Sequence, residues 1–269
     1  MREFTQRFFK YITLLVFIVF VWFAVVYSAL QNSQLPAAAQ VDAPNNITTS
    51  LSFRHGAAIR KSRESVVRIV SMSDTIGSFA TTSGTYVAYK NKYYILTVDH
   101  GIMGSCEKVM ILTAEGLHSC LRFAARDMVS DYAVIEVDPL PGRKPISIPR
   151  DIPHGKRWLT NLSALTEVFY TGFPNAVGPL TINGHIAGYS GEDYIYLHSY
   201  AWAGASGSGV FNENGKLIGY VMAVNVGYTE YGYDVIEDIV IVVPVFSVNW
   251  EEVDQQSNQE QANVENDEP

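Results

Sequence analysis

Short runs rich in Val, Ile and Tyr, separated by Gly, Asn and Pro, recur from residue 62 to residue 250 and constrain the fold more than any other feature. Runs of this length and composition predict β-strands, and no soluble helical periodicity there exceeds about two turns. The predicted strands are Val66–Val70, Thr85–Tyr89, Tyr93–Val98, Val109–Thr113, Ala133–Val137, Thr166–Tyr170, Tyr194–His198, Gly209–Phe211, Leu217–Val224 and Val240–Val245.

Strands of this number and length favour barrels or a sandwich. The segment from Asp138 to Pro153 carries five prolines and divides the strands into two halves. Lys90–Asn91–Lys92 and Asn214–Gly215 stand where tight hairpin turns would lie. We therefore expect an all-β domain over residues 62–250, built as two six-stranded-type β-barrels at about 62–138 and 156–250 with a cleft between them.

An uncharged apolar stretch precedes this domain, from Tyr11 to Leu30. At 1.5 Å per helical residue it spans roughly 30 Å, the thickness of one hydrocarbon core, and predicts a transmembrane helix. The alternative is a signal peptide, with Ala37–Ala39 as a small-residue cleavage site. Positive charges before the span and none after it until Asp42 place residues 1–10 in the cytoplasm. In either case the rest of the chain is exported, as a single-pass, signal-anchored membrane protein if the segment is kept.

The chain outside the domain is polar. Residues 31–61 predict a flexible stalk, and residues 251–269 predict a disordered tail. That tail holds seven of the acidic residues and no Lys or Arg, and it accounts for most of the net charge of −8. The remainder is nearly neutral and carries no basic stripe, which excludes nucleic acid as a partner.

Cys106 and Cys120 are the two cysteines of the chain. Two cysteines allow at most one bridge, and they exclude a four-cysteine zinc site. An exported domain permits a Cys106–Cys120 disulfide, and two buried thiols are the alternative. The six histidines show no metal-ligand spacing, so we expect neither a metal nor a cofactor.

Three fragments supply the groups of a nucleophilic site: LTVDHG with His100, SDYAV with Asp131, and GASGSG with Ser206. A serine hydroxyl needs a base to take its proton, the base needs a carboxylate to orient it, and the developing oxyanion needs backbone donors. The order His, Asp, Ser differs from that of α/β-hydrolases, and Ser208 breaks the GxSxG pattern which that fold needs.

From Glu64 to about Val245 the chain resembles a trypsin-like serine protease domain, nearest in pattern to the HtrA-type branch and without a PDZ domain after it. The resemblance is carried by ESVVRIV, SGTYVAYKNKYYILTVDHGI, SDYAVIEVD, TGFP with GPLTINGHIAG, and GASGSGVFNENGKLIGYV. It implies His100 as general base, Asp131 as its orienter and Ser206 as nucleophile. It also implies an oxyanion hole formed by the N–H groups of Gly204 and Ser206.

Two departures accompany the resemblance. Ala205 stands where trypsins have Asp and HtrA-type enzymes usually have Asn, and Ser208 replaces a glycine. By the family pattern the residues before Ser206 and the strand after it line the substrate pocket. None of them is acidic, so we expect a small or medium apolar side chain there. The expected pocket residues are Tyr200, Ala201, Trp202, Tyr220, Met222 and Ala223.

The sequence thus predicts a membrane-anchored serine endopeptidase that cuts exported polypeptides outside the membrane through an acyl-enzyme. Its partners would be polypeptide substrates and the lipid bilayer, the latter through residues 11–30, and its oligomeric state is left open. The alternative is a catalytically impaired module of the same fold that binds peptides or partner proteins, and Ala205 and Ser208 motivate it.

Overall fold

The structure, a computed structural model, describes residues 48–73, 77–150, 162–191, 193–229 and 232–255. The predicted cytoplasmic segment 1–10, the predicted transmembrane segment 11–30 and residues 31–47 of the predicted stalk lie outside the described residues, as do residues 256–269. Of the helices in the described ranges, none is both long and apolar enough to cross a membrane.

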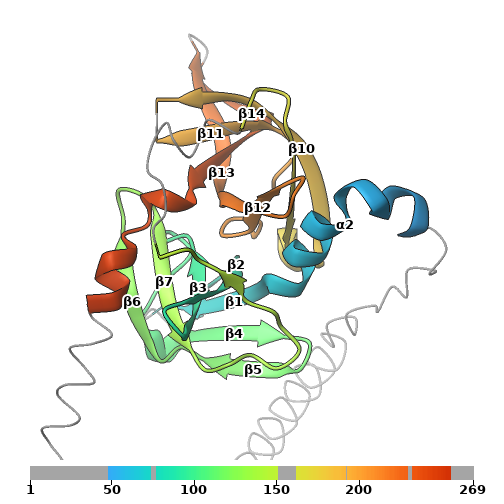
Figure 1. Cartoon of the computed structure of the whole chain (residues 1–269). Coiled ribbons are helices and arrows are strands. Elements are labelled where there is room, and N and C mark those ends of the chain that lie inside the picture. Colours follow the sequence, from blue (N-terminus) through green and yellow to red (C-terminus); the bar gives the residue numbers. More distant parts are fainter. Residues whose placement is uncertain (1–47, 74–76, 151–161, 192, 230–231, 256–269) are drawn as a thin grey trace, which may run out of the picture. The chain divides into compact units, whose positions relative to one another are not determined.

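The first half of the described chain contains one helix and eight strands, and the second half contains six strands (Figure 1). The first-half elements are α2 (Thr48–Ser65), β1 (Val66–Met72), β2 (Phe79–Tyr89), β3 (Lys92–Thr97), the 3-10 turn η1 (Cys106–Lys108), β4 (Val109–Thr113), β5 (Gly116–Ser119), β6 (Arg122–Asp127), β7 (Tyr132–Val137) and β8 (Ile146–Ser147). The second-half elements are β9 (Glu167–Gly172), η2 (Pro174–Ala176), β10 (Leu180–Ser190), β11 (Tyr194–His198), β12 (Gly209–Asn212), β13 (Leu217–Thr229), β14 (Gly232–Pro244) and η3 (Val245–Ser247).

The strands of the first half form one sheet in the order β5-β4-β1-β2-β3-β7-β6, with β8 added in parallel to β2. The prediction of a six-stranded barrel at 62–138 is therefore corrected: the sheet has eight strands, and its hydrogen bonding does not close. The eighth strand, β8, comes from the proline-rich segment that the sequence suggested only as a divider. Its two residues pair with Val87 and Ala88 despite the neighbouring prolines.

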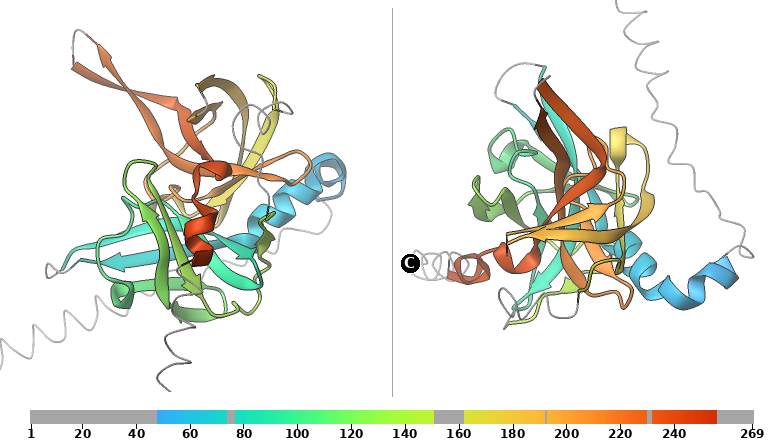
Figure 2. Two further views of the ribbon diagram at one scale, coloured as in Figure 1. Left: turned by 60° about the vertical axis from the view of Figure 1, so that its left-hand side comes forward. Right: turned by 90° about the horizontal axis from the view of Figure 1, so that it is seen from above.

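The second half forms the closed six-stranded barrel that the sequence predicts, in the order β10-β11-β14-β13-β12-β9. β13 and β14 pair from Gly219↔Pro244 to Thr229↔Gly232 and extend away from the barrel as a long two-stranded arm (Figure 2). All ten predicted strands correspond to strands of the structure: β4 and β11 have the predicted bounds, and the other eight have shifted ends. β5, β6, β8 and β10 were not predicted, because polar residues and glycines interrupt their apolar pattern.

Three groups of buried side chains form the core. One lies in the first sheet, one lies in the closed barrel, and the third joins the two halves. The third group includes Leu96 from β3, Phe211 from β12 and Tyr220 from β13. Because this shared core links the two halves, it holds the ends of β3 and β7 against the loop before β12.

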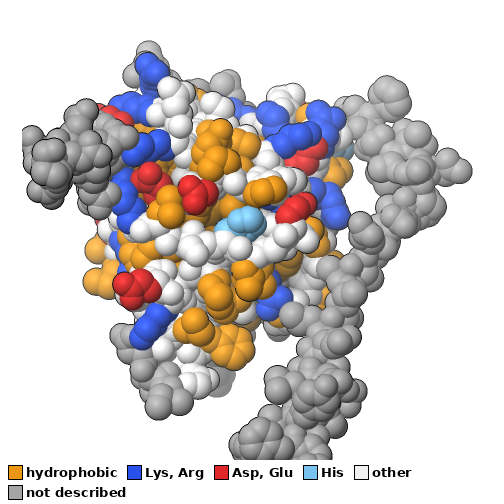
Figure 3. All heavy atoms as spheres, turned by 90° about the horizontal axis from the view of Figure 1, so that it is seen from below, with side chains coloured by type: hydrophobic (Ala, Val, Ile, Leu, Met, Phe, Trp, Pro, Cys, Tyr) orange, Lys and Arg blue, Asp and Glu red, His pale blue; other side chains and the backbone are white. Residues whose placement is uncertain are grey.

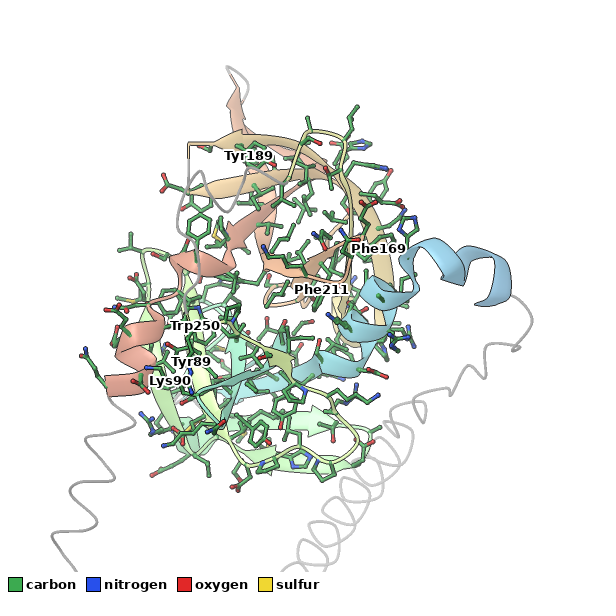
Figure 4. The ribbon with its side chains drawn as sticks, in the orientation of Figure 1. Tyr89, Lys90, Phe169, Tyr189, Phe211 and Trp250 are labelled. Carbon is green, nitrogen blue, oxygen red and sulfur yellow. A yellow bond between two sulfur atoms is a disulfide. The ribbon has the colours of Figure 1, made fainter. Side chains whose placement is uncertain are left out.

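Two boundaries of the predicted domain are corrected. α2 begins at Thr48, so residues 48–61 are helical where the sequence suggested stalk; Ala58 is fully buried and Lys61 Nζ donates to the Gly215 carbonyl. At the other end, residues 250–255 are helical where the sequence suggested a disordered tail. Tyr89, Lys90 and Trp250 lie together there (Figure 4), and the rings of Tyr89 and Trp250 are 5.3 Å apart.

These corrections have one physical cause. Both segments are polar on average, and only a few of their side chains, such as Ala58 and Val253, are buried against the domain. Composition predicts a solvated chain in such cases, and tertiary packing decides the structure.

Candidate active site

His100 and Asp131 are brought together by the pairing of two strands. β3 ends at Thr97, three residues before His100, and β7 begins at Tyr132, one residue after Asp131. β3 and β7 are antiparallel with Thr97 opposite Ala133, so the end of one strand and the start of the other meet at one edge. His100 Nδ1 lies 2.7 Å from Asp131 Oδ2, and the His100 N–H donates to Asp131 Oδ1 at 2.9 Å.

The pair is partly open to solvent. The His100 side chain is 53% exposed, and the Asp131 side chain is 15% exposed. The hydrogen bond between the His100 ring and the Asp131 carboxylate raises the pKa of His100 above its ordinary value, while partial burial acts in the opposite direction. A second carboxylate, that of the buried Asp99, contributes to the rise. Arg126 pairs with Asp99, with 2.6 Å between Nε and Oδ1.

The backbone directly before Asp131 is held by hydrogen bonds to the side chains of Asp127 and Tyr220. Asp131 has a φ of 50°, an unusual value for a residue other than glycine. Asp127 Oδ1 accepts hydrogen bonds from the N–H groups of Val129 and Ser130. The hydroxyl of Tyr220 donates to the Ser130 carbonyl from the closed barrel. These bonds hold the backbone on which the Asp131 carboxylate depends.

Ser206 lies in the loop between β11 and β12, and β2 of the first sheet binds this loop. The Ser206 carbonyl accepts hydrogen bonds from the N–H of Ser83 at 2.9 Å and from the hydroxyl of Thr82. The same threonine packs against the residue after His100: a Cβ atom on Gly101 would lie 2.9 Å from Thr82 Cγ2. Thr82 therefore lies between Gly101, the residue after His100, and the backbone of Ser206.

Most polar backbone groups of the Ser206 loop are paired within the protein. The carbonyls of Ala203, Gly204 and Ala205 accept from Asn175 N–H, Ser83 Oγ and Ser208 respectively. The N–H groups of Ala205, Gly207 and Ser208 donate to the carbonyls of Trp202, Val221 and Ala205. Within the described ranges, the N–H groups of Gly204 and Ser206 donate no hydrogen bond. These two N–H groups are thus available as donors to a bound group.

The residues expected to line a substrate pocket lie in different environments. Tyr200 and Trp202 are 57% and 50% exposed, and their rings stack with centroids 6.1 Å apart. Ala201 and Met222 are half-buried. Tyr220 is fully buried in the shared core, and burial raises its pKa well above the usual value for tyrosine. The side chain of Ala223 lies outside the described set.

The segment that carries Tyr200 is anchored from inside the barrel. The Tyr170 hydroxyl of β9 donates to the Tyr200 carbonyl, and burial raises the pKa of Tyr170 to about 12. The hydroxyl therefore keeps its proton at neutral pH and remains a donor.

Cys106 and Cys120 form a disulfide with a Cα–Cα distance of 5.4 Å. This settles the alternative between a bridge and two thiols. Among the described residues no cluster of His, Cys, Asp and Glu is arranged to hold a metal ion.

Three residues at the site were not singled out from the sequence: Thr82, Ser83 and Asn175. Each acts on the Ser206 loop from a distant part of the chain. For Ser83 a signal was present, because the β2 sequence places small polar residues where a strand facing the core would carry apolar ones.

The comparisons with known proteins agree with this architecture. A model of the trypsin-like peptidase domain matches residues 82–219, just over half of the chain. The fold and the site together define the class of trypsin-like serine peptidases. The chain belongs to the trypsin-like peptidase domain family. No curated protein matches the chain.

Solved structures of similar fold include three proteases. The serine endoprotease from Yersinia pestis matches with a TM-score of 0.57 and 22% identity over 74% of this chain and 66% of that one. The Rv3671c protease of M. tuberculosis, in its active form, matches with a TM-score of 0.55 and 16% identity over 72% of this chain and 82% of that one. The HtrA-type protease AlgW, with a tripeptide, matches with a TM-score of 0.52 and 16% identity.

The match with AlgW covers 71% of this chain and 60% of that one. The chain thus spans just under two thirds of the Yersinia pestis protein and less of AlgW. At these identities the likeness concerns the fold, which is the chymotrypsin-like double barrel with its first half open.

Proposed function

We propose that the chain is a membrane-anchored serine endopeptidase in which His100, Asp131 and Ser206 form a catalytic triad. The observation that carries the proposal is the His100–Asp131 pair at 2.7 Å, next to a serine loop that leaves only the Gly204 and Ser206 N–H groups unpaired among those of residues 204–208. Family membership supports the reaction class.

Each group has a chemical role in this proposal. His100 Nδ1–H donates to Asp131, which fixes the tautomer and leaves Nε2 to take the proton of Ser206 Oγ. The oxygen then attacks the scissile carbonyl, and the N–H groups of Gly204 and Ser206 stabilise the negative charge on the tetrahedral intermediate. His100 returns the proton to the leaving amine, and water hydrolyses the acyl-enzyme by the same route.

The substrate class is polypeptide, with apolar side chains favoured beside the nucleophile. Tyr200 and Trp202 expose aromatic surface a few residues before Ser206, and Met128 and Val129 are exposed just before Asp131. Hydrophobic side chains gather in several patches on one face of the molecule (Figure 3). Unfolded or extended segments present such side chains, which folded proteins bury.

The proposed location is the outer side of a membrane, with residues 1–10 in the cytoplasm and residues 11–30 as the anchor. The disulfide supports an exported domain, because reducing compartments keep cysteines as thiols. The test is fractionation of cells expressing the full chain. Retention in the membrane after carbonate washing, with proteolytic access from the outer side, is expected; a soluble, processed chain would show cleavage after the apolar segment instead.

The activity is tested by hydrolysis of fluorescently labelled casein by the full chain in detergent. Ser206→Ala is expected to abolish hydrolysis, since loss of the nucleophile in such triads costs about 10⁶ in kcat. Ser147→Ala, at an exposed position in β8, is the matched control and should leave hydrolysis unchanged. Equal hydrolysis by the wild type and Ser206→Ala would overturn the assignment.

A further inference from the structure

Ser208 replaces a glycine of the pattern in the Ser206 loop, and its hydroxyl is buried. Its side chain is fully buried, and Oγ donates to the Ala205 carbonyl at 2.6 Å. The Ser208 N–H donates to the same carbonyl at 3.1 Å. Gly172 leaves room for this hydroxyl, because a Cβ atom on Gly172 would overlap Ser208 Oγ.

The Ala205 carbonyl belongs to the same peptide group as the Ser206 N–H. In a trans peptide these two bonds point in opposite directions. A carbonyl held by two donors therefore fixes the direction of the Ser206 N–H, which is one of the two N–H groups left without a partner. Rotation of this peptide group would break both hydrogen bonds that Ser208 donates to the Ala205 carbonyl.

Ser83 holds the neighbouring peptide group from the first sheet. It is fully buried, and its hydroxyl donates to the Gly204 carbonyl at 2.7 Å while accepting from the Phe173 N–H at 2.9 Å. Its own N–H binds the Ser206 carbonyl. Its carbonyl accepts from Thr97 Oγ1 at 2.7 Å, so every polar group of Ser83 is used.

We infer that the hydroxyls of Ser83 and Ser208 are positioning groups for the oxyanion hole: they hold the two peptide groups that flank Ala205, so that the Ser206 N–H is set before substrate binds. The Gly204 N–H lies in the preceding peptide group, whose Ala203 carbonyl accepts from the Asn175 N–H. The inference rests on the proposed function. It assigns a role to the Ser208 departure, which supports the hole instead of disrupting it.

A preset hole acts on the transition state more than on the substrate, because the negative charge appears only as the carbonyl is attacked. Removing one oxyanion donor typically lowers kcat by about 10²–10³. Ser208→Ala removes a hydroxyl that orients such a donor and leaves the Ser208 N–H in place. The expected effect is therefore smaller, about 10-fold in kcat with KM unchanged, and Ser83→Ala should give a similar loss.

The experiment compares the wild type with Ser208→Ala, Ser83→Ala and the control Ser62→Ala, all as the full chain in detergent. Ser62 is buried and its hydroxyl donates to Thr171 Oγ1 at 2.6 Å, so the control loses a buried hydrogen bond in which no residue of 203–208 takes part. The first probe is a rhodamine-tagged fluorophosphonate, whose rate of labelling is measured. The second is acetyl-Ala-Ala trifluoromethyl ketone, whose hemiketal oxygen carries the charge of the intermediate.

The expected result is labelling about 10-fold slower in Ser208→Ala and in Ser83→Ala, with trifluoromethyl ketone affinity reduced by the same factor and both values unchanged in Ser62→Ala. Labelling at the wild-type rate in folded Ser208→Ala and Ser83→Ala would overturn the inference and leave the proposed function intact. A wild type that does not react at all would instead refute the proposed function. Each variant removes one of the two hydroxyls, and the two residues lie in different halves of the fold. If one variant does not fold, wild-type labelling by the other is therefore enough to refute the inference.

Discussion

The Tyr220 hydroxyl of β13 lies 3.0 Å from the Ser130 carbonyl, the residue directly before Asp131. Tyr220 belongs to the closed barrel, and Ser130 belongs to the open sheet. This hydrogen bond therefore joins the two halves at the backbone that carries the carboxylate. It fits the buried position of Tyr220, for which the sequence suggested a place in the substrate pocket.

Replacing Tyr220 by Phe removes this hydrogen bond and leaves the ring in the core. A hydrogen bond of this kind contributes about 1 kcal/mol to stability. We expect a fall in kcat of roughly 3- to 10-fold with KM little changed, because the bond acts through Asp131 and not through a substrate contact. Tyr189→Phe is the matched control, since its hydroxyl donates to the Leu162 carbonyl at 2.6 Å in the closed barrel. A rise in KM with unchanged kcat would instead support the sequence-based prediction that Tyr220 lines the substrate pocket.

The pH dependence of activity follows from His100. The base must be neutral, and Asp131 raises the pKa of His100, so activity should fall on the acid side with a midpoint above the ordinary value of about 6.5. Asp131→Asn should lower both kcat and this midpoint. The measurement is kcat/KM between about pH 5 and pH 9. A profile without an acid limb would refute His100 as the base.

The contribution of His100 to the free energy of unfolding should decrease as the pH rises, whereas the activity should increase. Because the pKa of His100 is raised in the folded state, the His100–Asp131 ion pair stabilises the fold below the unfolded value of about 6.5. That stabilisation is lost as pH rises through the raised folded value. Chemical denaturation of the wild type and of Asp131→Asn measures this effect at one pH below about 6.5 and at one pH above the raised folded pKa. The difference in unfolding free energy between the two proteins should shrink as the pH rises. A difference that grows with pH would contradict the direction of the shift.

A substitution at Gly207 tests how closely β2 and the Ser206 loop approach each other. Its φ is 86°, and a Cβ atom there would overlap the Ser83 carbonyl oxygen. Gly207→Ala should therefore lower the free energy of unfolding by more than about 2 kcal/mol and slow fluorophosphonate labelling. Gly188→Ala is the control, because no atom lies within 4 Å of its Cβ position, and it should change stability by less than about 1 kcal/mol. Equal effects of the two substitutions on urea unfolding would show that the loop and β2 are not in contact.

The Cys106–Cys120 disulfide should stabilise the domain without taking part in the reaction. It closes a loop across a sequence separation of 14, for which the loop-closure model gives about 3 kcal/mol. The double variant Cys106→Ser with Cys120→Ser should lose about that much unfolding free energy and keep wild-type kcat at a temperature where it is folded. Unchanged stability, with the bridge verified in the wild type by mass, would contradict this role.

The sequence predicts the strands well where Val, Ile and Tyr are concentrated. It also identifies His100, Asp131 and Ser206 as candidate catalytic residues, because each lies close to the end or the start of such a strand. It does not predict β10, whose glycines and polar residues alternate with few apolar ones, or α2, whose packing depends on single buried residues such as Ala58. These elements are fixed by partners distant in the chain, and local composition carries little of that information.

The site shows the same division. The side chains of the proposed triad were identifiable as candidates from their types and their order along the chain. The groups that position them were not, because Ser83 and Tyr220 act through backbone carbonyls of residues more than 80 positions away. A hydrogen bond between a side chain and a distant carbonyl leaves no spacing pattern in a single sequence.

The proposed mechanism depends on the convergence of His100 and Asp131 with Ser206, and mass spectrometry of the fluorophosphonate-treated full chain tests this convergence most directly. We expect a single covalent adduct on Ser206 in the wild type and a reaction at least about 1,000-fold slower in His100→Ala, in line with the cost of losing a triad member. No adduct on Ser206, or equal labelling of the wild type and His100→Ala, would contradict it.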